Sequence, residues 1–164
     1  MKKSPLFLKK YFSDISVIAK RIDINLTLKL IENINNIKKK NGRIFFLGVG
    51  GSAGNCSHAV NDFRKLCNIE CYSPIDNVSE LTARINDEGW NTSMKEWLKV
   101  SRIRNTDAIF IFSVGGGNIK KKVSINLIEA MKFAKTKKTK IFGIVGKKHS
   151  YAKKIGDCIL EVPE

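Results

Sequence analysis

The chain has 164 residues, 43% of them hydrophobic, and its 30 Lys and Arg residues against 15 Asp and Glu residues give a formal net charge of +15 at pH 7. This length suits one domain, 1–164, and the composition excludes a disordered or membrane-spanning chain, since no apolar run approaches the ~20 residues that a bilayer requires. Residues 1–10 lack the sustained apolar region of a signal peptide, so we predict a cytoplasmic protein.

Apolar periodicity and glycine or proline punctuation predict an alternation of helices and strands. Two helices occupy the N-terminal part, 1–41, and the remainder, 42–164, forms the core. The helices are predicted at 5–20, 24–40, 53–66, 78–85, 90–103, 121–136 and 150–155, and the strands at 43–48, 69–73, 107–113, 140–146 and 158–162.

The predicted strands are near-continuous apolar runs separated by helices. Such strands are typical of a parallel sheet that is covered on both faces. We therefore predict an α/β fold, a three-layer αβα sandwich with a five-stranded parallel sheet.

The excess of positive charge comes mostly from lysine, in runs at predicted helix ends and in loops. Lysines there complement the helix dipole or face water. No nucleic-acid-binding motif accompanies them, so the sequence argues against a specific nucleic-acid partner. The charge alone would support attraction that is independent of sequence and sensitive to salt, and it would also draw anionic metabolites toward the protein.

The four cysteines show no CxxC pair and no zinc-ribbon spacing. We interpret them as reduced thiols that serve as small buried hydrophobic residues.

Glycine-rich turns follow two of the predicted strands. The first strand ends in Gly48-Val49-Gly50-Gly51-Ser52, and the third ends in Ser113-Val114-Gly115-Gly116-Gly117-Asn118. Glycines let the backbone approach an anion closely, and the amides at the start of the next helix point toward it. Two converging turns favour anion binding over simple tight connections. A dinucleotide is disfavoured, because Ala53 replaces the last glycine of G-x-G-x-x-G.

Two further groups of polar residues flank the predicted helices. His58 and Asp62 stand four residues apart and therefore share one helix face. They suit either a surface pair or a metal-binding and acid–base pair. Asn86 and Asp87 follow an apolar helix and are typical of a helix end.

These motifs, in this order, resemble the sugar isomerase (SIS) domain from about residue 25 to 163. The closest similarity is to phosphoheptose isomerases, which convert sedoheptulose 7-phosphate to a heptose phosphate for surface polysaccharide (lipopolysaccharide) synthesis. The resemblance implies a flavodoxin-like sheet, a phosphorylated sugar as substrate, and a homo-oligomer, tetramer or dimer, with sites at subunit interfaces.

The resemblance also implies roles for individual residues. His58 matches a zinc ligand, and Asp62 falls where the family places a glutamate that ligates zinc and moves the proton between C1 and C2. The substrate-binding residues that it implies are Gly50, Gly51, Ser52, Asn86, Asp87, Ser113, Gly115 and Asn118.

The sequence departs from the family pattern at three places. Asp62 is one methylene shorter than glutamate, and Val114 with three glycines replaces a loop rich in Ser and Thr. The family also has a C-terminal helix whose Gln and His complete the zinc site, whereas the sequence in hand ends at Glu164. His149, the other histidine, is predicted to be solvated. The alternative to an isomerase is therefore a non-catalytic module that binds sugar phosphates.

Overall fold

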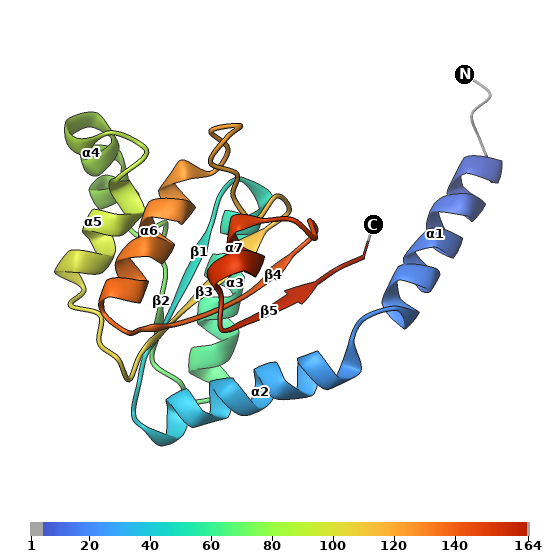
Figure 1. Ribbon diagram of the computed structural model, residues 1–164, viewed down its shortest axis with the longest axis horizontal. Coiled ribbons are helices and arrows are strands. Elements are labelled where there is room, and N and C mark those ends of the chain that lie inside the picture. The colour runs from blue at the N-terminus through green and yellow to red at the C-terminus, as the bar shows by residue number, and fades with distance from the viewer. Residues whose placement is uncertain (1–4, 164) are drawn as a thin grey trace.

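The computed structural model describes residues 5–163, which form an α/β domain around one parallel sheet (Figure 1). The five strands lie in the order β2-β1-β3-β4-β5, as in the predicted three-layer sandwich. The outermost positions of the predicted domain, 1–4 and 164, lie outside the described residues. In chain order the strands are β1 (Ile44–Gly48), β2 (Cys71–Tyr72), β3 (Ala108–Ser113), β4 (Lys140–Val145) and β5 (Cys158–Glu161).

Helices cover both faces of the sheet. Helices α2 and α3 pack on one face, α5, α6 and α7 pack on the other, and α4 contacts α5 beyond the β2 edge (Figure 1). In chain order the helices are α1 (Pro5–Lys20), α2 (Ile24–Lys39), α3 (Gly51–Lys65), α4 (Val78–Glu88), α5 (Ser93–Val100), α6 (Ile125–Thr136) and α7 (Tyr151–Ile155).

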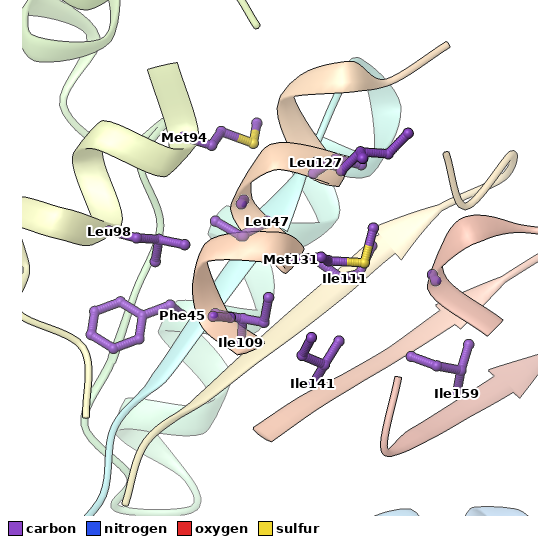
Figure 2. Packing of buried hydrophobic residues seen from close by; sticks show 14 of the residues in the cluster. Phe45, Leu47, Met94, Leu98, Ile109, Ile111, Leu127, Met131, Ile141 and Ile159 are labelled. Atoms are coloured by element: carbon purple, nitrogen blue, oxygen red, sulfur yellow. The ribbon is translucent and has the colours of Figure 1, made fainter. Parts of the chain in front are cut away.

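Side chains of β1 alternate between the two faces, as the two-residue period of a strand requires. Phe45 and Leu47 enter the core beneath α5 and α6, which Figure 2 shows together with Met94 and Met131. Ile44 and Phe46 enter the second core beneath α2 and α3. Since both faces are buried, β1 needs apolar residues at every position, and this requirement produces the continuous apolar run in the sequence.

Helix α6 begins four residues later than predicted. A tight turn occupies residues 118–123, where Asn118 and Val123 exchange two backbone hydrogen bonds of 3.0 Å. Lys122 and Ser124 have positive φ angles of 51° and 53°, which no helix tolerates, so the helix starts only at Ile125. The prediction placed Lys121 and Lys122 at the start of this helix, and that boundary is wrong, because both lie in the turn.

Helix α1 extends away from the sheet, to the right in Figure 1, and buries none of its residues. Apart from the half-buried Ile18, its large apolar side chains remain exposed, among them Leu8, Phe12 and Ile15, which share one face of the helix. Within residues 5–163, none of the helices combines the length and the apolar character that crossing a bilayer would require.

The four cysteines are free thiols, and three of them, Cys56, Cys71 and Cys158, are buried. Cys67 is exposed, so the prediction of burial is wrong for this residue. Burial raises the pKa of Cys56 and that of Cys71 to about 12. These two thiols are therefore protonated at neutral pH and act as packing groups, as predicted.

Candidate functional site

Ser52 and Ser113 line one cavity of about 390 Å³ at the carboxyl ends of the strands. Ser52 lies in the first turn of α3, and Ser113 is the last residue of β3. Asn55 contributes a third polar side chain, and Ile18, Ile144 and Val162 supply apolar walls. The size and the mixed lining suit a small organic molecule that carries a charged group.

The strand order explains why the two serines meet. From β1 the chain crosses by way of α3 to β2 on one side, whereas β3, β4 and β5 extend to the other side. The connections therefore diverge between β1 and β3, and a crevice opens at their carboxyl ends. Open α/β sheets bind their ligands at such a switch point.

The first glycine-rich turn leaves its backbone accessible. Gly50 precedes α3 with φ at 62° and offers no side-chain cap. The amides of Ala53 and Gly54 donate to the carbonyl of Gly50, which leaves the amides of Gly51 and Ser52 for an anion. A Cβ placed on Gly50, Gly51 or Gly54 would meet no atom within 4 Å. Packing therefore does not require a glycine at position 51 or 54. The absence of side chains there leaves open space beside the backbone amides at the start of α3.

Gly48 has a different role. A Cβ there would lie 2.6 Å from the carbonyl oxygen of Ser52 and 2.9 Å from Sγ of Cys56. Its small size lets α3 pack directly against the end of β1, and this packing places Ser52 over the crevice.

The second glycine-rich turn is held by internal hydrogen bonds. Oγ of Ser113 accepts a hydrogen bond of 3.0 Å from the amide of Gly116, and its own proton remains free to be donated. Gly116 and Gly117 have φ angles of 60° and 83°, and a Cβ on Gly116 would lie 2.5 Å from the side chain of Ser150. Turn conformation and packing thus account for these two glycines, whereas Gly115 faces open space.

Asn118 lies at the far end of this turn and does not line the cavity of Ser52 and Ser113. Its Oδ1 accepts a hydrogen bond from the amide of Lys121, which stabilises the turn. Asn118 instead lines a second cavity together with His149. His149 is exposed, as predicted.

His58 and Asp62 lie on the outer part of α3, with Nε2 of His58 3.2 Å from Oδ2 of Asp62. Their side chains are 78% and 42% exposed. Zinc sites in proteins use four ligands, or three with a water. Within residues 5–163 no group of three His, Cys, Asp or Glu side chains could hold a metal ion. Two ligands alone do not fit a zinc site, so we derive no chemical step through a metal.

Asn86 and Asp87 occupy the last turn of α4, at the opposite side of the molecule from β5 (Figure 1). Nδ2 of Asn86 donates a hydrogen bond of 2.7 Å to Oδ1 of Asp87, and both side chains are exposed. Within one chain, the structure does not bring this pair to the cavity of Ser52 and Ser113.

Asn55 is a site residue that the sequence analysis missed. It lies three residues after Ser52 on α3 and lines the cavity. His58 and Asp62 follow it at intervals of three and four residues, so these side chains form one stripe along α3 that begins at the cavity and leads away from it. This spacing was visible in the sequence, but an asparagine within a helix carries no chemical signature of its own.

No protein-family model and no curated protein sequence matches the chain. Among solved structures, the phosphoheptose isomerase GmhA from Neisseria gonorrhoeae is similar, with a TM-score of 0.86 and 22% identity, over 98% of this chain and 86% of that one. A phosphoheptose isomerase from Francisella tularensis gives a TM-score of 0.78 and 14% identity, over 99% and 85% of the two chains.

The sugar isomerase domain of the RpiR transcription factor from Sphaerobacter thermophilus is similar as well. Its TM-score is 0.64 at 15% identity, over 98% of this chain and 76% of that one. Similarities at these identities show that the chain shares the fold of enzymes and of a regulator, and the predicted fold class is confirmed.

Proposed function

We propose, on the basis of this shared fold, that the protein is an aldose–ketose isomerase that binds a phosphorylated sugar at Ser52 and Ser113. The observation that carries the proposal is the common cavity of these two serines at the switch point of the sheet. Two hydroxyl donors and the uncapped start of α3 converge there, and such donors suit a phosphate dianion.

The reaction moves one hydrogen between adjacent carbons. In the ketose-to-aldose direction a base takes a proton from C1, next to the carbonyl at C2, and an enediol forms. The carbonyl oxygen O2 gains a proton as the enediol forms. In the second half of the reaction C2 gains a proton and O1 loses its hydroxyl proton, so the atoms balance. Asp62 is our candidate for the base, since it is the carboxylate on the stripe of α3 that starts at the cavity.

The position of Asp62 favours a long substrate. Ten residues separate it from Ser52, which corresponds to roughly 15 Å along a helix at 1.5 Å per residue. A phosphate at Ser52 and a reacting carbon near Asp62 therefore require an extended chain. Sedoheptulose 7-phosphate, with seven carbons, is the first substrate to test, and its product would be a heptose phosphate for surface polysaccharide synthesis.

The affinity for sedoheptulose 7-phosphate tests the phosphate site. We expect Ser52→Ala to weaken binding by about tenfold, since a hydrogen bond to a charged group contributes roughly 1.5–3 kcal/mol. Isothermal titration calorimetry measures the effect. Ser57→Ala is the matched control, because Ser57 lies on the same helix but donates to Asp76. Equal affinities of wild type and Ser52→Ala would show that the phosphate binds elsewhere.

A non-catalytic module that binds sugar phosphates is the second candidate. It is favoured by the exposure of His58 and Asp62 and by the lack of a third ligand near them among residues 5–163. Binding of sugar phosphates without turnover, with and without added zinc, would select this candidate.

We further propose that the chain assembles with copies of itself through α1. A 16-residue helix is marginally stable in water by itself, and α1 buries no residue within one chain. Its exposed apolar face, with Leu8 54% and Phe12 64% exposed, would be buried between subunits. Such an assembly could also supply the metal ligands that one chain lacks.

The oligomeric state is tested by light scattering after gel filtration. We expect a mass that is a multiple of 18.4 kDa for the full chain, and a single-chain mass for the double variant Leu8→Lys/Phe12→Lys. Lys9→Gln, a change on the same helix that removes no apolar group, should leave the assembly intact. A monomeric wild type would contradict the proposal.

A further inference from the structure

A second cavity, of about 350 Å³, borders the end of the second glycine-rich turn, at Gly117 and Asn118. The turn after β3 forms one wall, with Asn118 and Lys120, and the start of α7 forms the other, with His149, Tyr151 and Lys154. None of the residues that line this cavity lines the cavity of Ser52 and Ser113.

The walls of this cavity are fixed by backbone hydrogen bonds. The amide of Tyr151 donates to the carbonyl of Gly117 over 3.0 Å, and the amide of Ala152 donates to that of Gly116 over 2.9 Å. The turn is closed in addition by the paired hydrogen bonds between Asn118 and Val123. The cavity is therefore formed before any ligand arrives.

Every formally charged group that lines the cavity is a cation. Lys120 and Lys154 come from its two walls, and no Asp or Glu of the described residues 5–163 lines it. Neither lysine forms an ion pair with any carboxylate among residues 5–163, whereas the adjacent Lys153 lies 3.4 Å from Glu161. Two lysines beside one cavity without a carboxylate create a positive potential that only an anion from outside can neutralise.

The remaining lining groups suit a ligand that is more than a bare ion. The hydroxyl of Tyr151 and the imidazole of His149 offer hydrogen bonds, and the Tyr151 ring, which packs on the hydrophobic core, offers an apolar surface. The volume lies within the range of small-molecule sites.

We propose that this cavity is a second anion site, which takes a phosphorylated small molecule with its phosphate between Lys120 and Lys154. The site is separate from the one proposed for the substrate, and it does not depend on isomerase activity. Both sites border the turn from Ser113 to Gly117, the first at Ser113 and the second at Gly117.

Inorganic pyrophosphate is the probe, and amide chemical shifts of the full chain in ¹H–¹⁵N NMR spectra are the readout. We expect shifts that saturate at residues 117–120 and 149–154. The double variant Lys120→Gln/Lys154→Gln should weaken this binding by at least about tenfold, since it removes two charge-assisted contacts to the phosphate. Both positions are exposed, so the fold should be retained, and a thermal melt checks it.

Lys39→Gln/Lys65→Gln removes the same charge from two exposed positions at the ends of α2 and α3, and it should change the affinity less than twofold. An equal loss of pyrophosphate affinity in both double variants would show that only the overall charge of the protein attracts the anion, and the proposal would be wrong. Shifts confined to residues 50–55 and 113–115 would likewise overturn it and would assign the binding to the substrate cavity.

Discussion

Asp62→Asn is expected to lower the rate of sedoheptulose 7-phosphate isomerisation by at least about 100-fold, because a positioned general base contributes roughly 10²- to 10⁴-fold. The variant keeps the size of the side chain and removes its basicity. Binding should persist, since the phosphate is expected near Ser52, ten residues away on α3. A coupled assay of the heptose product gives the rate, and calorimetry gives the affinity.

The matched control is Glu32→Gln, which removes one carboxylate from an exposed position on α2. Its rate should equal that of wild type. Normal turnover by Asp62→Asn would remove Asp62 from the mechanism. If wild type and variant both bind the sugar phosphate and neither converts it, the protein is a binding module and not an isomerase.

Most of the fold could be predicted from the sequence because the buried strands have no solvent-facing side. The run Ile44 to Leu47 is apolar at each position, and glycines flank it, so its strand state and its burial follow from the pattern alone. The start of α6 could not be predicted in this way. The turn at 118–123 depends on the side chain of Asn118 and on two positive φ angles, which local propensity does not reveal.

The candidate site was predictable only where the sheet itself brings residues together. Ser52 lies shortly after the end of β1 and Ser113 is the last residue of β3, and the carboxyl ends of these two strands are neighbours in the sheet. Asn118 lies five residues after the end of β3, and Asp87 lies in the last turn of α4. Their positions depend on turn geometry and on helix packing at the sheet edge, and neither can be read from motif order.

Two of the glycines illustrate why a motif can mislead about chemistry. Gly116 suits a phosphate loop, yet its positive φ and its contact with Ser150 already require a glycine. Gly51 has neither constraint, since its φ is not positive and a side chain there would meet open space. Of the two, Gly51 is therefore the better evidence for a ligand that approaches the backbone.

Asp107→Asn is expected to destabilise the fold by about 3 kcal/mol, because breaking a buried ion pair leaves its donors without an acceptor. Asp107 is fully buried and lies 2.7 Å from Nη2 of Arg43. It also accepts hydrogen bonds of 2.9 Å from the amides of Arg43 and Arg104. These contacts join the start of β1 to the start of β3, the two strands that carry the candidate site. Urea denaturation measures the free energy of unfolding.

The pH dependence of the free energy of unfolding distinguishes the loss of the Asp107 charge from a change in side-chain packing. Burial raises the pKa of Asp107, but the hydrogen bonds from Arg43 and Arg104 outweigh it and hold the pKa below its ordinary value. A carboxylate with a depressed pKa stabilises the folded state above its unfolded pKa of about 3.9, and this contribution is lost as the pH falls. The difference between wild type and Asp107→Asn should therefore be full at pH 7 and shrink as the pH falls below about 4. A difference that stays constant with pH would mean that the loss reflects packing and not charge.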